Sequence, residues 1–227
     1  MPALHRDIPY AMRALKAASW LGTPEPQTLL DLAEAAYIET HGPGTTIAQR
    51  GELCSHLIIV VSGFLVVGVE LANGSRHVNN LLGPGQAHAL IPLLDEGPVH
   101  HDARTKGWVE LLLIPRDAFI KAMAQDAALN WAVLRGLCRR NRYLTEALAE
   151  RTALPVSVQL GCVLLRLFEQ YGEKLTISQE DLSEILGVTR QTVSRELRQM
   201  QLHGLINIAR GQIRLLNKNG LVEASGH

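Results

Sequence analysis

The sequence predicts an α+β protein with an N-terminal β-roll, a long helix and a C-terminal winged helix-turn-helix. Three observations lead to this fold class. Short apolar segments alternate with turns rich in glycine and proline over about residues 37–114. A stretch without proline covers residues 116–154, and two helical patterns joined by Gly187 precede a hairpin pattern. With 227 residues, the chain has room for one large domain or two small ones.

The composition excludes several classes of protein. Lys plus Arg and Asp plus Glu both number 22, which excludes a polybasic wrapping protein but not a local basic face. Cys54, Cys138 and Cys162 form no CxxC pair, so we expect buried, reduced thiols rather than a zinc ribbon. The chain shows neither a secretory signal nor a run of about 20 apolar residues, which predicts a soluble cytoplasmic protein.

The first predicted domain, residues 1–115, begins with helical spacing of apolar residues over 1–36 and continues as a β-roll. Asn73-Gly74 is the strongest hairpin pattern, because both residues tolerate positive φ. Strands are expected at Leu57–Val61, Phe64–Leu71 and Val109–Ile114, with turns at 42–44, Ser62-Gly63, Asn73-Gly74 and 83–85.

A dimerisation helix is predicted within residues 116–154. Its apolar positions alternate at spacings of three and four, with one polar residue among them, which is typical of a short coiled-coil seam. A helix packed inside one monomer can carry the same stripe. The charged flanks favour a two-stranded homodimer in which Asn141 fixes the register. The predicted dimer seam consists of Leu134, Leu137, Asn141, Leu144 and Leu148.

Residues 155–227, beyond a hinge at Leu154-Pro155, are predicted to form the winged helix-turn-helix. Ser178 and Asp181 give a capping pattern, and Gly187 supplies the positive φ that a sharp turn needs. The second helix begins after Thr189 and exposes long hydrogen-bond donors, as expected of a recognition helix in a major groove. The two following segments, 205–209 and 212–216, are expected to form the wing.

Charge favours double-stranded DNA as the partner over an ordinary amphipathic hairpin with a solvated face. Between residues 187 and 218 the only acid is Glu196, whereas the basic residues are concentrated there. Arg210, at the tip of the wing, is expected to contact a phosphate. The predicted DNA-binding residues are Thr189, Arg190, Gln191, Ser194, Arg195, Arg198 and Arg210.

The order of these parts over residues 25–218, and above all the motif LGVTRQTVSR at 186–195, resembles the Crp/Fnr family of bacterial transcription regulators. The resemblance implies that Arg190, Gln191 and Arg195 contact DNA, with Ser194 beside them. It also implies RNA polymerase as a partner. Many members have Glu where this chain has Gln191. Since Gln suits the N6/N7 edge of adenine, the preferred half-site is expected to differ.

The resemblance also implies a cyclic-nucleotide-binding type of β-roll, whose phosphate cassette has a Gly-Glu-Leu turn followed by an Arg. Here Leu90, or Ala89 in a shifted register, stands at the place of the acid, and Val99 or His100 at the place of the Arg. We therefore expect an effector other than cAMP, or none. The expected effector pocket contains His88, Ala89, Leu90, His100, Arg104, Leu144 and Thr145.

Other effectors and functions remain open at this point. A haem- or metal-based sensor is an alternative because some relatives bind haem in this region, yet in a strand His100 and His101 would point to opposite faces and could not chelate together. We expect no metal and no cofactor, and the lack of Cys in residues 1–53 excludes the iron–sulfur branch. Catalytic motifs are also missing, so an enzyme is not expected. The remaining alternative is a small-molecule-binding module whose winged helix contacts protein.

Overall fold

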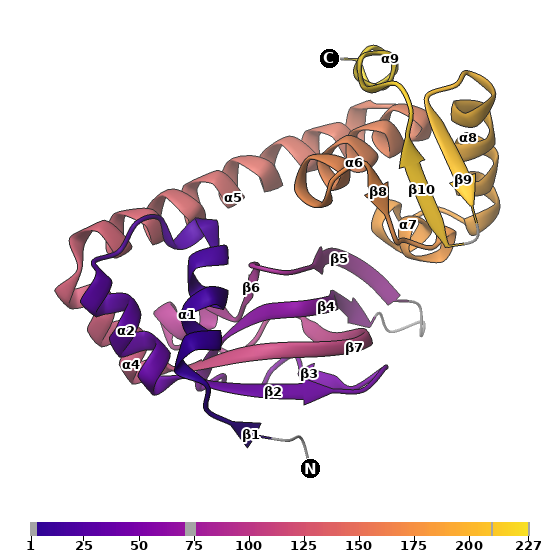
Figure 1. Ribbon diagram of the computed structural model, residues 1–227. Coiled ribbons are helices and arrows are strands. Elements are labelled where there is room, and N and C mark those ends of the chain that lie inside the picture. The colour runs from indigo at the N-terminus through magenta and orange to yellow at the C-terminus, as the bar shows by residue number, and fades with distance from the viewer. Residues whose placement is uncertain (1–3, 71–75, 210, 227) are drawn as a thin grey trace. The chain divides into compact units, whose positions relative to one another are not determined.

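The computed structural model describes residues 4–70, 76–209 and 211–226. By contacts between residues, the chain divides into two compact units, residues 1–141 and 142–227, and each is described by itself. The α+β fold class is confirmed, since strands fill the middle of the first unit and helices dominate the second (Figure 1).

One antiparallel sheet organises the first unit, in the order β1-β2-β7-β4-β5, with β3 on β7 and β6 on β4. The long pair β4 and β7 runs through its centre, from His56 opposite Pro115 to Gly68 opposite Asp102. The strands are β1 (Leu4–His5), β2 (Tyr37–His41), β3 (Thr46–Ala48), β4 (His56–Glu70), β5 (Arg76–Leu82), β6 (Ala87–His88) and β7 (Asp102–Pro115).

Strand β4 corrects one predicted turn. Ser62-Gly63 does not end a strand but lies inside β4, where the register against β7 shifts on both sides of Ser62. Gly63 has φ +78°, and a Cβ there would lie 2.3 Å from the carbonyl oxygen of Trp108. Glycine at this position therefore lets β4 form a bulge and continue as one strand. The expected Asn73-Gly74 turn lies outside the described residues, although β4 and β5 on either side of it pair antiparallel.

Alternation along β4 divides its side chains between two cores. Leu57 and Ile59 point to a core under the helices, whereas Ile58 and Val60 point into the roll. The helices α1 (Ile8–Ala17), α2 (Pro26–Ala35) and α4 (Arg116–Gln125) gather at one side of the sheet, with a 3-10 turn at Ser19–Leu21 and the short α3 at Leu90–Asp95 (Figure 1). The helical pattern expected over residues 1–36 is therefore confirmed.

Asp126 divides the helical stretch that follows the roll into α4 and the long α5 (Ala127–Ala153). Its Oδ1 accepts a hydrogen bond from the N–H of Leu129 at 3.0 Å, so it caps the first turn of α5. Its Oδ2 accepts from the N–H of Glu25, the N-cap residue of α2, at 2.8 Å. Burial alone would raise the pKa of Asp126, but these backbone hydrogen bonds and one from Thr28 hold it below its usual value.

The second unit has a helical core and a small sheet in the order β8-β10-β9. Its longest complete helix ends at Gly172, as predicted, and its middle is buried on all sides, since each residue from 160 to 165 is buried. None of the helices in the described part of the chain is long and apolar enough to cross a membrane. The elements are α6 (Val156–Tyr171), β8 (Lys174–Leu175), α7 (Gln179–Leu186), α8 (Arg190–Leu202), β9 (Ile206–Ala209), β10 (Gln212–Leu215) and α9 (Lys218–Ala224).

Candidate nucleic-acid interface and effector pocket

Local capping fixes the angle between α7 and α8. Oγ of Ser178 accepts from the N–H of Asp181, while the Asp181 carboxylate accepts from the N–H of Ser178, which completes the predicted capping box. Gly187 ends α7 with φ +69°, and Oγ1 of Thr189 caps α8 by accepting from the N–H of Thr192. These contacts place the start of α8 directly after a sharp turn, as the sequence predicts.

The two faces of α8 differ in chemistry. Val193, Leu197 and Met200 are buried, as predicted, and hold the helix against its own unit. The opposite face is hydrophilic and open to solvent. Thr189, Arg190, Gln191, Arg195 and Arg198 are exposed there, with Ser194 half-buried among them. Except for Arg210, which lies outside the described residues, the structure therefore brings the predicted DNA-binding residues to one face.

Two carboxylates contact the arginines of this face. Glu196 accepts from both Nε and Nη2 of Arg195, at 3.0 and 2.8 Å. On α7, Oε2 of Glu180 lies 4.0 Å from Nε of Arg190. The sequence shows Glu196 as the only acid in this basic segment but gives no indication that it holds Arg195, so this contact was missed.

The wing is an antiparallel pair of strands. Residues of β9 pair with β10 from Ile206 opposite Leu215 to Ala209 opposite Gln212, and β10 also pairs with β8. This arrangement confirms the predicted hairpin, with strands one residue shorter than expected at their outer ends. Sheet and helices together form a winged helix-turn-helix.

Comparison with known proteins identifies both halves of the chain. A family model described as a Crp-like helix-turn-helix domain matches residues 159–224. A second, described as a cyclic nucleotide-binding domain, matches residues 38–126. The chain belongs to the Crp/Fnr family. This Crp/Fnr protein is a DNA-binding transcription regulator, which confirms the predicted family, fold and function class.

Two relatives of this regulator are named for cAMP. The chain is 26% identical over 209 residues to a CRP-like cAMP-activated global transcriptional regulator of Mycobacterium tuberculosis, covering 88% of this chain and 90% of the relative. It is 26% identical over 171 residues to the cyclic AMP receptor protein of Thermus thermophilus, covering 75% and 79%. These relatives are transcription regulators, which agrees with the prediction that the chain is not an enzyme.

Solved structures of the family share the fold of this Crp/Fnr regulator. FixK2 from Bradyrhizobium japonicum superposes with a TM-score of 0.75 at 20% identity, over 83% of this chain and 96% of FixK2. The c-di-GMP responsive regulator CLP of Xanthomonas campestris gives a TM-score of 0.67 at 18% identity, over 85% and 100%.

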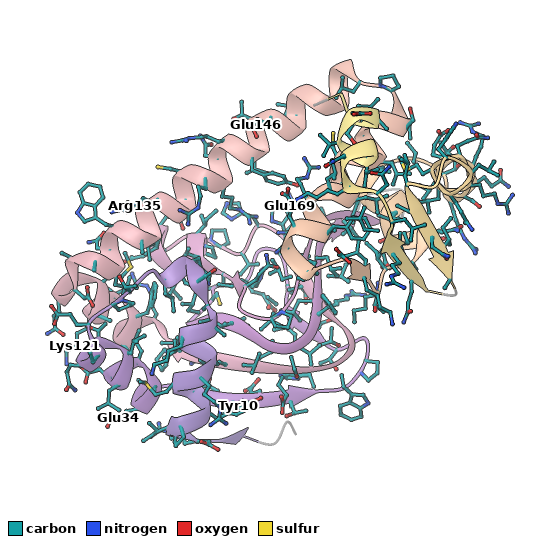
Figure 2. The ribbon with its side chains drawn as sticks, turned by 45° about the horizontal axis from the view of Figure 1, so that its top comes forward. Tyr10, Glu34, Lys121, Arg135, Glu146 and Glu169 are labelled. Atoms are coloured by element: carbon teal, nitrogen blue, oxygen red, sulfur yellow. The ribbon has the colours of Figure 1, made fainter. Side chains whose placement is uncertain are left out.

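Helix α5 of this regulator presents apolar side chains to solvent. Leu144 is 51% exposed and Leu148 is 66% exposed, and Leu134 is also exposed. Leu137 differs from them because it packs against the core under the helices. Trp131 is a further exposed apolar residue on α5 that the heptad spacing missed. Arg135 and Glu146, labelled in Figure 2, belong to the charged positions of the same helix.

The cassette of this Crp/Fnr regulator keeps the backbone shape of a glycine turn without the glycine. Ala89 has φ +69°, the left-handed conformation that glycine favours, and Leu90 begins α3 directly after it. In the register that puts Leu90 at the place of the acid, Ala89 stands at the place of the glycine that precedes it. Leu90 is half-buried against the core under the helices, so an apolar side chain occupies that place.

The other expected pocket residues belong to different segments of the chain. His100 and Arg104 are exposed, and Arg104 lies in β7 opposite Thr46 and Val66. His100 and His101 lie in a bend before β7, so the expectation that they occupy opposite faces of a strand is wrong. Leu144 and Thr145 are exposed on the part of α5 that belongs to the second unit.

His88 is the buried polar residue among those expected to form the effector pocket. It is 8% exposed, and among the described residues its Nε2 has no hydrogen-bond partner. Burial, and then the positive charges of His101 and Arg140, lower the pKa of His88 to about 4. His101 and Arg140 were missed from the sequence because Arg140 lies some fifty residues further along the chain, on α5.

Replacing His88 by leucine is expected to change how stability depends on pH. The pKa of His88 is 6.5 in the unfolded chain and about 4 in the folded protein. The free energy of unfolding therefore falls by about 3 kcal/mol as the pH falls between these values. Urea unfolding at pH 7 and 4.5 measures this loss. His88→Leu should reduce it, although the lowered pKa values of His56 and His101 leave part of it. An unchanged loss in the variant would show that His88 is not buried in the neutral form.

The remaining histidine, cysteine and acidic side chains bear on metal binding and on the burial of the thiols. Among residues that the structure describes, no three His, Cys, Asp or Glu side chains are grouped so as to hold a metal ion. The expectation of three buried thiols is wrong for Cys138, which is exposed on α5, whereas Cys162 is buried and Cys54 half-buried.

Proposed function

We propose that this regulator binds an inverted-repeat operator as a homodimer, with one α8 in each of two successive major grooves. The exposed face of α8 carries this proposal, because long donors cover it while Val193, Leu197 and Met200 fix the helix from behind. A two-fold dimer matches the symmetry of such an operator, and its half-sites should lie about one helical turn apart.

We propose that a second copy of this chain packs against the apolar stripe on α5. Leu134, Leu144 and Leu148 are exposed at heptad spacing, and the polar Asn141 lies between them, as in helices that pair in one register. Association along this stripe removes the exposed leucines from water. RNA polymerase is a further proposed partner, supported by the membership of the family alone.

Operator selection from a random DNA library tests the DNA-binding proposal. The purified regulator should enrich an inverted repeat, and its affinity should fall steeply with salt because arginines replace condensed counterions. A winged helix that contacts only protein would enrich no sequence.

A second candidate function concerns the β-roll, which we propose binds an effector other than cAMP. The unpartnered Nε2 of the buried His88 supports a ligand that hydrogen-bonds to this atom, since a buried polar atom left unpaired destabilises the fold. Relatives named for cAMP and for c-di-GMP support a family scaffold whose ligand varies. Haem or a metal bound at the same place is the alternative.

The absorbance spectrum and native mass of freshly purified protein distinguish these effectors. A Soret band would identify haem, and a mass increment would identify a retained small molecule or metal. Protein without either that still binds its operator tightly would be a regulator that needs no effector.

Calorimetry with cAMP is expected to give no binding up to about 1 mM, which corresponds to only about 4 kcal/mol of binding free energy. The cyclic phosphate carries a charge that must be paired when it leaves water. This cassette offers the apolar Leu90 and an exposed His100, and a neutral histidine cannot form the fork of an arginine.

The double variant Leu90→Glu with His100→Arg provides the constructive counterpart. If it gains cAMP binding, the pocket is intact and only its polar anchors differ. Micromolar cAMP binding by the unmodified protein, with Arg104 on the phosphate, would show that the assigned register across residues 97–108 is wrong.

A further inference from the structure

Glu196 is the acidic neighbour of Arg195 on α8 and holds its side chain. Nε and Nη2 of Arg195 both donate to Oε1 of Glu196, at 3.0 and 2.8 Å. The Glu196 side chain is only 16% exposed, whereas that of Arg195 is 69% exposed. Within the described part of the chain, the Glu196 carboxylate has no other hydrogen bond or ion pair.

This contact occupies one particular edge of the guanidinium group. An arginine has five N–H donors, and the bonds to Glu196 use the side edge formed by Nε and Nη2. The end edge, formed by Nη1 and the second hydrogen of Nη2, stays available. Two donors at that end match the O6 and N7 acceptors of guanine.

The geometry also resists exchange of partners. Neighbouring residues on a helix do not normally face each other, so both side chains must bend along the helix to meet. If Arg195 turned its side edge to a phosphate, Glu196 would lose the partner that it has among the described residues while remaining largely covered by protein. Arg195 therefore reaches DNA with the least loss when it keeps Glu196 and offers its end edge.

We propose that Glu196 is a positioning residue that fixes which edge of Arg195 faces the base and thereby sets the preference for guanine at one base pair. This inference rests on the proposed role of Arg195 in base contact. It assigns to the one acid of a basic helix a role in specificity, although its negative charge lowers the attraction to phosphate.

Two variants separate positioning from simple repulsion. Glu196→Ala removes the acceptor, whereas Glu196→Gln keeps an oxygen for Arg195 without the charge. Glu223→Ala, on the exposed surface of α9, removes one negative charge from the same unit and serves as the matched control. Each is made in the wild-type and in the Arg195→Ala background.

The readout is the dissociation constant for the operator with the contacted guanine replaced by adenine, divided by the dissociation constant for the selected operator. Glu196→Ala should lower this ratio about two- to fivefold per half-site, the range expected for one exposed ion pair. Glu196→Gln should fall between wild type and Glu196→Ala. In the Arg195→Ala background neither change should alter the ratio, and Glu223→Ala should not alter it in either background.

Other outcomes would overturn the inference. If Glu196→Ala strengthens binding to both operators equally, as a repelling charge predicts, Glu196 does not position Arg195. If Arg195→Ala lowers the ratio but Glu196→Ala does not, this inference fails while the proposed function stands. If Arg195→Ala itself leaves the ratio unchanged, the proposed role of Arg195 fails as well. Thermal unfolding and circular dichroism confirm that each variant folds.

Discussion

Arg195→Ala is expected to weaken operator binding by about 1–3 kcal/mol per half-site, or roughly 5- to 150-fold, and to remove the preference for one base pair. The loss is large because one residue supplies both donors of a bidentate contact. In a homodimer each operator contains two such contacts, whose effects add when the half-sites are well separated. Fluorescence anisotropy on the selected operator, and on the three operators that carry another base pair at that position, measures affinity and preference together.

Arg214→Ala is the matched control for charge. Arg214 is exposed on β10 of the same unit, so its loss should weaken all sequences alike and lower the salt dependence. If the Arg195→Ala variant binds with wild-type affinity, either α8 is not the recognition helix or another face of α8 contacts the bases.

Leu144→Asp with Leu148→Asp is expected to abolish the homodimer. Each dimer would bury four carboxylates without partners, which weakens association by roughly a thousandfold or more. Because both leucines are exposed in the protomer, the variant should fold normally. Sedimentation analysis gives the mass directly, and operator affinity should fall together with the dimer.

Leu216→Asp is the control for this variant, since Leu216 is 56% exposed but lies outside α5. Leu137→Asp is less informative, because Leu137 also packs against the core of the first unit and its loss would destabilise that unit. A double variant that still sediments as a dimer would refute pairing through α5.

Local patterns account for what the sequence predicted well. The capping box at Ser178 and Asp181, the end of α6 at Gly172 and the buried face of α8 all depend on residues three or four positions from the next. Such short-range hydrogen bonds and periodic faces are present in the sequence itself. The candidate DNA-binding residues followed from them, because exposure of the second helix face is the complement of burial of the first.

The features that were missed depend on partners distant in sequence or on geometry. The break before α5 is stabilised by the N–H of Glu25, about a hundred residues from Asp126. Gly63 was interpreted as a turn because a glycine that ends a strand and one that forms a bulge look alike in sequence. The effect of Arg140 on His88 likewise needs α5 to pass near β6.

Asp126 limits which part of α5 can move relative to the roll. Its carboxylate ties the first turn of α5 to the start of α2, and a Cβ at Gly22 would lie only 2.8 Å from Cβ of Ala132, one turn further along. The first two turns of α5 thus lie against the N-terminal segment, through the hydrogen bond to Glu25 and the close approach at Gly22. Any tilting of α5 relative to the roll would therefore begin beyond Ala132. Residues 22–25 would keep their place against the first turns of the helix.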